Sequence, residues 1–157
     1  MRLSSKSDYA LRALFHLTEL YQGAETKPVS IRVLAGRNNI PKRYLEQIMI
    51  DLRERGWVKS ISGREGGFIL GKHPSQITMG DVVRHFDSIL APIDCVSETH
   101  YRACTQEGVC KFRRVLLDIR NYTTARMDEA TLEKVAAGPI VTMKDVFRDS
   151  FIDGSGI

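Results

Sequence analysis

The segment PKRYLEQIMIDLRERG, residues 41–56, constrains the possible fold more than any other stretch of the chain. Its apolar residues fall at i, i+3, i+4 and i+7, the spacing of one buried helix face. They are Leu45, Ile48, Met49 and Leu52. Pro41 suits the first helical position, where its missing N–H has no intrahelical partner, and Gly56 is a typical helix stop. The segment therefore predicts an amphipathic helix.

A shorter helix is predicted just before this one. Ser30 can cap a helix over 30–38, and the Asn-Asn pair at 38–39 breaks it. Its core candidates are Ile31, Val33, Leu34 and Ala35. Two helices joined by a short turn, the second beginning with basic residues, predict a helix-turn-helix unit.

The flanking segments complete a winged helix-turn-helix pattern. Residues 5–21 carry an apolar stripe at helical spacing. Segments 57–61 and 68–71 read as two short strands on either side of a Gly-rich turn, and so predict a β-hairpin. The order helix, helix, helix, hairpin predicts a mainly α fold with a small β-hairpin, in which residues 1–75 form a winged helix-turn-helix DNA-binding domain.

Residues 76–137 are predicted to form a second unit. Thr78 can cap a helix over 78–90, which Pro92 closes. Its inward side chains are expected to be Val82, Val83, Phe86 and Leu90. A loop that contains every cysteine of the chain follows this helix. The loop therefore separates two helical regions.

The longest periodic run of the chain predicts a helix at about 109–127, and a short helix follows from Thr131. A long apolar helix near the end of a small domain suits a dimer interface, but packing on its own domain explains the pattern equally well. Residues 138–157 are expected to form a flexible C-terminal tail.

Charge and composition limit the class of partner. The net charge of +4 is uneven, because residues 1–73 carry 13 Lys and Arg against 7 Asp and Glu, whereas the remainder is slightly acidic. A basic first half favours a polyanionic partner. No run of about 18 apolar residues could span a membrane, and Arg12 interrupts any apolar core of a signal peptide. We expect a cytoplasmic protein without a membrane partner, in a compartment that disfavours a disulfide framework.

The predicted recognition helix begins with side chains that can contact DNA. Lys and Arg neutralise phosphates or reach guanine, Gln pairs with adenine, and Glu accepts from cytosine. The tip of the hairpin adds a basic residue flanked by glycines, which allow close approach to the nucleic acid backbone or the minor groove. The candidate DNA-binding residues are Lys42, Arg43, Tyr44, Glu46, Gln47 and Arg64. Each alone fits an ordinary exposed side chain, and Tyr44 fits the core equally well; their joint pattern favours DNA binding.

Three thiols occupy one irregular loop, with eight and five residues between them. Cys95, Cys104 and Cys110 lack the close pair of a zinc finger and the spacings of ferredoxins. Thiolates are soft ligands that suit iron–sulfur clusters, zinc or Cu(I). Their position on a loop, away from any apolar periodicity, favours a metal or cluster site over a redox thiol or a small buried side chain.

Four segments resemble successive signatures of the Rrf2 family of bacterial transcriptional regulators: SSKSDYALRAL, PKRYLEQIMIDLRERGWVKSI, GREGGFILGKHP and QITMGDVVRHFD. The resemblance covers roughly residues 1–137. It implies a homodimer of winged helix-turn-helix protomers, joined by long helices, that binds a pseudo-palindromic operator. Two positions depart from the family pattern: Pro41 replaces a serine, and Ser62 replaces an arginine, so that Arg64 takes that role. The operator sequence therefore does not transfer.

The resemblance also implies a role for the thiols. In the three-cysteine branch, with NsrR-like, IscR-like and RirA-like members, Cys95, Cys104 and Cys110 correspond to ligands of an iron–sulfur cluster. The IscR-like histidine ligand is missing, because that position is Arg113. The NsrR-like pattern instead implies Asp8 of the second protomer as fourth ligand of a [4Fe–4S] cluster, which we favour over [2Fe–2S]. Asp8 also fits the helix dipole at a helix start, and the loop contains the rivals Glu98, His100 and Glu107.

Three functions follow as hypotheses. The first is a regulator, expected to be a repressor, whose operator affinity depends on a cluster that senses iron, nitric oxide or redox state. The second keeps DNA binding but makes the thiols a disulfide switch or a zinc site. The third is an interaction module without DNA binding. An enzyme with a small-molecule substrate is not expected, because the four histidines are scattered and no catalytic constellation is recognisable.

Overall fold

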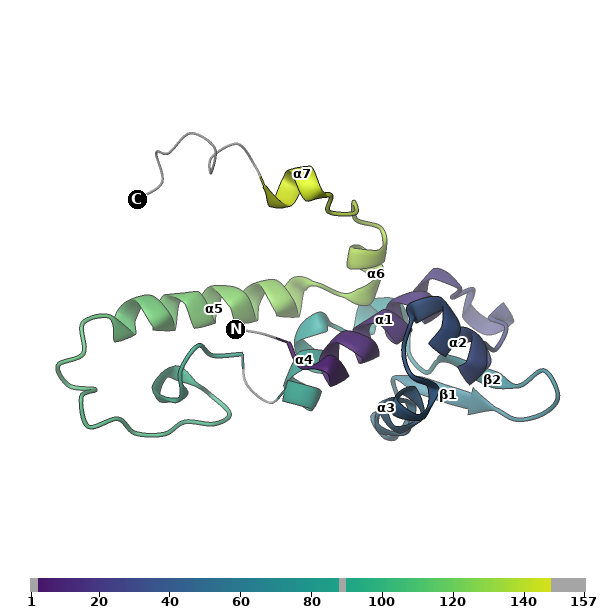
Figure 1. The fold of residues 1–157 in the computed structure, drawn as a ribbon, viewed down its shortest axis with the longest axis horizontal. Coiled ribbons are helices and arrows are strands. Elements are labelled where there is room, and N and C mark those ends of the chain that lie inside the picture. Colours follow the sequence, from purple (N-terminus) through teal and green to yellow (C-terminus); the bar gives the residue numbers. More distant parts are fainter. Residues whose placement is uncertain (1–2, 88–89, 148–157) are drawn as a thin grey trace.

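The computed structural model describes residues 3–87 and 90–147 (Figure 1). Its α-helices are α1 (Ser5–Glu19), α2 (Ile31–Asn38), α3 (Lys42–Glu54), α4 (Met79–Asp87), α5 (Arg113–Glu129), α6 (Leu132–Ala136) and α7 (Met143–Val146). The strands are β1 (Val58–Ile61) and β2 (Gly67–Leu70), and short 3₁₀ helices lie at η1 (Gly23–Glu25), η2 (Pro74–Gln76) and η3 (Asp94–Val96). The predicted fold class, mainly helical with one antiparallel hairpin, is confirmed. Within the described ranges, no helix is long and apolar enough to cross a membrane.

The helix-turn-helix forms as its local signals predict, with two differences. Ser30 caps α2 by accepting from the Val33 amide at 3.3 Å, and the predicted face of α3 is fully buried. The prediction that Pro41 is the first helical residue is wrong, because its backbone is extended and its carbonyl caps α3 by accepting from two amides. Val33 was a core candidate but is 44% exposed, since only one side of this short helix meets the core.

The hairpin is held against the helices at its base. β1 and β2 pair antiparallel, with Val58 opposite Leu70. Phe68 also pairs with Val29, just before α2, through N–O distances of 2.8 and 3.0 Å. A Cβ at Gly67 would collide with the Val29 carbonyl, so this close approach requires glycine. The hairpin and the helix-turn-helix are therefore attached as one unit. At the hairpin tip, Gly63 has a positive φ of +113°.

One hydrophobic core joins the predicted first and second units. It includes residues from α1, α2, α3 and the hairpin, and also Ile77, Val82, Val83, Leu90 and Leu132. Segments 77–79 and 130–132 are hydrogen-bonded to each other: the Leu132 amide donates to the Ile77 carbonyl at 2.9 Å and the Met79 amide to Ala130 at 2.8 Å. The division at residue 75 stays a prediction, but packing continues across it.

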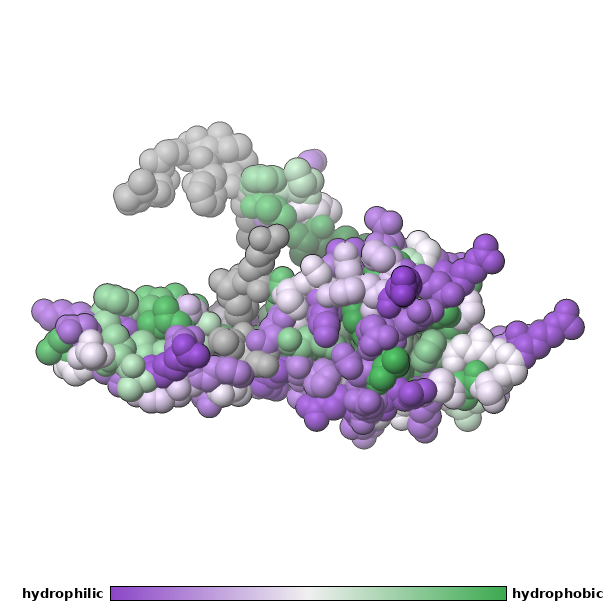
Figure 2. Space-filling model, turned by 60° about the horizontal axis from the view of Figure 1, so that its bottom comes forward, coloured by the Kyte–Doolittle hydropathy of each residue, from purple (hydrophilic) through white to green (hydrophobic). Residues whose placement is uncertain are grey.

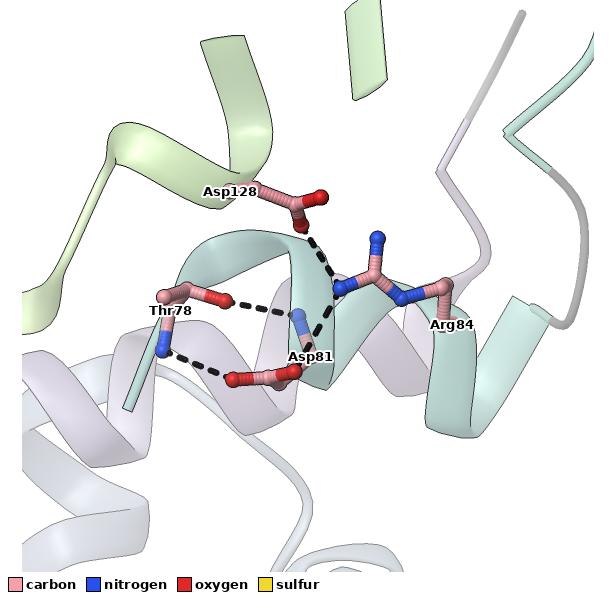
Figure 3. A network of polar contacts seen from close by, with 4 residues as sticks. All are labelled: Thr78, Asp81, Arg84 and Asp128. Carbon is pink, nitrogen blue, oxygen red and sulfur yellow. Dashed lines mark hydrogen bonds and ion pairs between the residues drawn. The ribbon is translucent and has the colours of Figure 1, made fainter. Parts of the chain in front are cut away.

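Polar contacts join α4 to α5 beside this backbone bridge (Figure 3). The Thr78 hydroxyl accepts from the Asp81 amide, which confirms the predicted cap of α4. Arg84 contacts Asp81 at 3.3 Å and Asp128 of α5 at 2.6 Å, and this hydrogen bond to Asp128 raises the pKa of Arg84. A Cβ at Gly80 would collide with the Asp128 carboxylate in its present position, so glycine leaves room for the contact between Asp128 and Arg84. We name the contact between Arg84 and Asp128 the α4–α5 brace.

Helix α5 begins at Arg113, four residues later than the start predicted from the apolar periodicity. No side chain caps this start, and residues 105–109 form turns instead. None of the residues of α5, all of which the structure describes, is buried. The helix extends with the cysteine loop away from the core, to the left in Figure 1.

Two further predictions concern the C-terminal part of the chain. The short helix predicted from Thr131 is present as α6, and Thr131 caps it by accepting from the Lys134 amide. Within the predicted tail, Thr142 and Asp145 form a capping box at the start of α7, so residues 143–146 are helical. The flexibility predicted for the tail stays a prediction, and residues 148–157 lie outside the described part of the chain.

Leu132→Ala tests whether α6 is part of the common core. Leu132 is fully buried, so we expect a loss of about 2–5 kcal/mol in the free energy of unfolding. Urea denaturation at one fixed protein concentration measures it. Val135→Ala is the matched control, because Val135 lies on the same short helix but is 38% exposed. Equal losses in the two variants would contradict the packing of α6 against the core.

Candidate DNA-binding surface and cysteine loop

The exposed side of α3 carries the predicted DNA-binding residues. Lys42, Arg43, Tyr44 and Gln47 are exposed, whereas Glu46 is half-buried. Glu46 lies 3.5 Å from Lys42, an exposed i,i+4 ion pair of about 0.3–0.5 kcal/mol. Such a pair is weak enough for Lys42 to exchange its partner for a phosphate. The first two turns of α3 thus present two cations and two polar side chains together.

Tyr44 connects the recognition helix to α1. Its ring meets the Tyr9 ring edge to face, with centroids 5.6 Å apart, while 38% of Tyr44 remains exposed. The Arg12 guanidinium lies 5.8 Å from the Tyr9 ring and forms an ion pair with Asp8 at 2.7 Å. An aromatic pair such as Tyr9 and Tyr44 contributes about 0.5–1.5 kcal/mol. Tyr44 is therefore both a packing residue and an available DNA contact.

The hairpin tip presents Arg64 and Glu65, and both residues are exposed. The turn from Gly63 to Gly66 is closed by a backbone hydrogen bond of 3.0 Å. A Cβ at Gly66 would collide with the Ile61 carbonyl, so the turn is tight. The rest of this lobe, at the right in Figure 2, is mainly hydrophilic. Arg64 therefore extends from a fixed base, as a wing residue must in order to reach DNA.

The three cysteines lie in different surroundings on the loop between α4 and α5. Cys95, in η3, is buried, Cys110 is half-buried and Cys104 is exposed, and all three are free thiols. Cys95 and Cys110 line one open hollow of about 430 Å³, whereas Cys104 lies with Cys95 on a second hollow. Nowhere in residues 3–87 and 90–147 do three His, Cys, Asp or Glu side chains converge as a metal site. A single copy thus brings the thiols to one region but does not gather them.

Two arginines of α5 fasten the loop to the helix. The Arg113 guanidinium donates twice to the Cys95 carbonyl, at 2.7 and 3.2 Å. Arg120, one of the least exposed side chains of the helix at 14%, forms an ion pair with Glu98. Both arginines also line the hollow beside Cys95. The position of the buried thiol is therefore determined by α5 as well as by the loop.

Glu107 collects donors from the exposed part of the loop. The Tyr101 hydroxyl donates to its carboxylate at 2.8 and 2.9 Å, and the Cys104 amide donates at 3.2 Å. These hydrogen bonds lower the pKa of Glu107, and the bond from Tyr101 has the largest effect. The bond between Tyr101 and Glu107 also raises the pKa of Tyr101. Glu107 is thus ionised at neutral pH.

The candidate fourth ligands are engaged in other contacts. Asp8 lies in the first turn of α1, as the helix-dipole interpretation predicts, and is paired with Arg12 on the surface. Of the loop rivals, Glu98 pairs with Arg120, and the His100 ring contacts the Thr99 hydroxyl at 3.1 Å. The surface pair at Asp8 is the easiest to exchange, because exposed ion pairs contribute little.

Known proteins share both the sequence pattern and the fold. The Rrf2 model, described as an iron-dependent transcriptional regulator, matches residues 3–138. A putative Rrf2-like HTH-type regulator of Rhodobacter capsulatus is 35% identical over 138 residues, covering 86% of this chain and 92% of that relative. The chain belongs to the Rrf2 family. It is therefore a transcriptional regulator of a DNA-binding family and not an enzyme, as predicted.

Two further relatives belong to different groups of regulators, NsrR and CymR. The HTH-type regulator NsrR of Geobacillus kaustophilus is 31% identical, covering 84% of this chain and 87% of that one. The solved structure of CymR, the global cysteine regulator of B. subtilis, has a TM-score of 0.74 at 31% identity and covers 87% of this chain and 97% of that one. These relatives confirm the winged-helix fold, but they do not decide between a cluster and a bare thiol.

The residues around the hollow fit an iron–sulfur cluster in chemical character. A cluster held by thiolates is anionic, and the hollow is lined by Arg113, Arg114 and Arg120 as well as by two cysteines. The Nε of Arg120 is one of the two buried side-chain polar atoms without a hydrogen-bond partner in the described part of the chain. Thiolate donors beside arginines, one of which has an unused N–H donor, suit such a group. The ligand set itself stays a prediction.

Sequence reasoning missed the residues that fasten the loop. Arg113 entered the sequence analysis only as a missing histidine, and Arg120 and the α4–α5 brace did not enter it. Arg113 and Arg120 are seven residues apart and so lie on one side of α5, together with Leu116 and Leu117, which are half-buried. Two arginines on the inner side of an amphipathic helix are a signal that could have identified them.

Arg43→Ala and Arg64→Ala test the DNA-binding surface. Because each removes an exposed cation from α3 or from the wing, we expect about tenfold weaker binding for each and a salt dependence shallower by about one unit. Fluorescence anisotropy at several salt concentrations measures both, with a duplex enriched from a random pool by the wild-type protein. Arg126→Ala is the matched control, since Arg126 is an exposed cation of α5. An equal loss in the control would contradict the assigned surface.

Proposed function

We propose that the protein is a homodimeric repressor whose operator affinity is set by an iron–sulfur cluster, with [4Fe–4S] favoured. Cys95, Cys104 and Cys110 would hold the cluster, and Asp8 of the second copy would complete it. The observation that carries the proposal is the placement of every thiol on one loop that α5 fastens beside an arginine-lined hollow. When bound, the cluster supplies a centre that responds to iron supply, nitric oxide or redox state.

Helix α5 offers a surface for the second copy. Phe112, Val115, Ile119 and Tyr122 are 67%, 59%, 49% and 70% exposed. They are spaced by three, four and three residues, the spacing of the apolar seam along which helices pair. The lobe that holds α5 and the cysteine loop, at the left in Figure 2, shows hydrophobic surface. This exposed seam supports a dimer joined by the long helices. It gives less support to the alternative that α5 packs only on its own domain, because no residue of α5 is fully buried in its own chain.

The contacts around α1 and α4 give a route from the thiols to the DNA surface. The loop is fastened to α5, and the α4–α5 brace holds α5 to the helix that follows the wing. Asp8 lies one residue before Tyr9, whose ring packs on Tyr44 of the recognition helix. A cluster that bound Asp8 of the second copy would compete with Arg12 for the Asp8 carboxylate and would shift the start of α1. The separation of the two recognition helices, which must match a helical turn of DNA, would then depend on the cluster.

A second candidate is a cluster-free regulator whose thiols form a disulfide or hold zinc. One observation favours it: the likeness to CymR, the global cysteine regulator. The exposed Cys104 is the thiol most open to oxidants. Here too the loop would act through α5, so the two candidates share the DNA-binding surface and differ only in what the thiols hold.

Anaerobic purification tests the cluster. We expect a brown protein with about four irons and four sulfides per chain, because three thiolates and one carboxylate supply four ligand positions. Nitric oxide or oxygen should then change its affinity for DNA. The Asp8→Ala variant should still bind the cluster but should lose it to a chelator faster than the wild type does. Asp118→Ala, which removes an exposed carboxylate of α5, should lose the cluster at the wild-type rate. The readouts are iron and sulfide content, the visible spectrum and anisotropy.

The same preparation separates the two candidates. Colourless protein that takes up no iron and sulfide under anaerobic reconstitution would rule out the cluster. A DNA affinity that then follows an oxidant would favour the disulfide, and one that follows a zinc chelator would favour zinc. Native mass spectrometry distinguishes these states by their added masses.

Ile119→Arg tests the dimer seam. The charge would lie among the exposed apolar side chains of two paired helices, so we expect a monomer at micromolar concentration. Asn121→Arg is the matched control, because Asn121 is exposed on α5 outside the seam. Light scattering after size-exclusion chromatography measures the mass of both variants. A dimeric Ile119→Arg variant, or a monomeric control, would contradict pairing along this face.

A further inference from the structure

Glu107 is unusual among the residues around it. Across residues 98–109, all of which the structure describes, it is the single residue that is not exposed. Its side chain is 23% exposed, whereas Tyr101 beside it is 54% exposed. An ionised carboxylate is normally found at the surface unless donors surround it. The burial of Glu107 therefore requires an explanation from its contacts.

Those contacts connect both sides of the cysteine loop. Tyr101 and the Cys104 amide donate to Glu107 from the N-terminal side. The Arg113 guanidinium approaches it to 3.5 Å from the start of α5. The same guanidinium donates to the Cys95 carbonyl at 2.7 Å. One carboxylate and one guanidinium thus join the backbones of two cysteines to each other and to α5.

The same contacts make Glu107 a poor candidate for an iron ligand. The tyrosine hydroxyl reaches both of its oxygens, and one oxygen also receives the Cys104 amide and Arg113. Binding iron would break these contacts and separate Tyr101 and the Cys104 amide from Arg113 of α5. One carboxylate cannot both hold the loop together and leave these contacts to bind metal. The geometry supports the first.

We propose that Glu107 and Arg113 are positioning residues, a clasp that holds Cys95 and Cys104 in place before any cluster is present. This rests on the proposed function, because it assigns the clasp to the site that would receive the cluster. The clasp acts on the apo protein: it restricts the loop, so that the thiols need less ordering when they bind a ligand. Outer contacts of this kind commonly change metal affinity by about 10–100-fold.

The test measures thiol reactivity in the reduced, chelator-treated full-length protein. Iodoacetamide is added anaerobically, and mass spectrometry of peptides gives the alkylation rate of each cysteine. In the wild type we expect slow reaction at the buried Cys95 and fast reaction at the exposed Cys104. Arg113→Ala removes the donor to the Cys95 carbonyl, and Glu107→Ala removes the carboxylate that pairs with Arg113. In both variants we expect Cys95 to react about tenfold faster, because the segment around it opens more often.

Glu129→Ala is the matched control, because Glu129 pairs with Arg126 on the exposed end of α5 and does not contact the loop. The loop contributes no residue to the main hydrophobic cluster between Leu90 and Leu132, so the fold is expected to survive in all three variants. Tyr101→Phe, which removes only the hydroxyl contacts, is a milder variant should Glu107→Ala fail to fold. Cys95 rates within twofold of wild type in the clasp variants, or an equal rise in the control, would overturn the proposal.

Iron loading separates this proposal from the proposed function. If the wild type takes up a cluster, the clasp variants should lose it to a chelator about 10–100-fold faster than the Glu129→Ala protein. Equal rates of loss would overturn the clasp and leave the cluster standing. If the wild type takes up no cluster, the proposed function fails, while the alkylation rates of the apo protein still decide whether the clasp exists.

Discussion

The structure beyond the DNA-binding half depends on a short backbone bridge. Segments 77–79 and 130–132 are hydrogen-bonded, and Leu132 enters the common core beside them. Helix α4 contributes Val82 and Val83 to the core, whereas the cysteine loop and most of α5 lie away from it, and the chain returns to the core at Leu132. Because both ends of this excursion are fixed, a change in the loop reaches the DNA-binding half through α4, α6 or a second copy.

The polar contacts along α5 follow from this arrangement. No residue of the helix is fully buried, and Met127 near its end packs against the core. The rest of the helix therefore has little of the apolar packing that normally fixes a helix. Arg113 and Arg120 hold the loop near its start and middle, and Asp128 holds α4 near its end. Its outer seam is left for another chain. Helix α5 therefore has a polar side that organises one protomer and an apolar side that suits a partner.

Local sequence predicted those features that depend on near neighbours. The predictions of caps at Ser30 and Thr78, of a helix start near Thr131 and of the buried face of α3 are all confirmed, because each depends on residues within one or two turns. The start of α5 was placed too early, since the apolar periodicity continues into residues 109–112, which are not helical. The contacts of Arg113 and Arg84 join residues 18 and 44 positions apart, which a helical or strand period does not encode. The thiol geometry depends on a ligand and a second copy as well as on the chain.

The close approach of Gly67 to Val29 has a consequence for how the operator preference can change. Any side chain at position 67 would push the hairpin away from the helix-turn-helix, so this base tolerates little variation. Residues 62–65, in contrast, are exposed. New binding preferences can therefore arise by substitution at the tip of the hairpin while its base stays constant. The departure from the family pattern predicted at Ser62, with Arg64 beyond Gly63, would be a change of that kind, made at the tip while the scaffold beneath it stays the same.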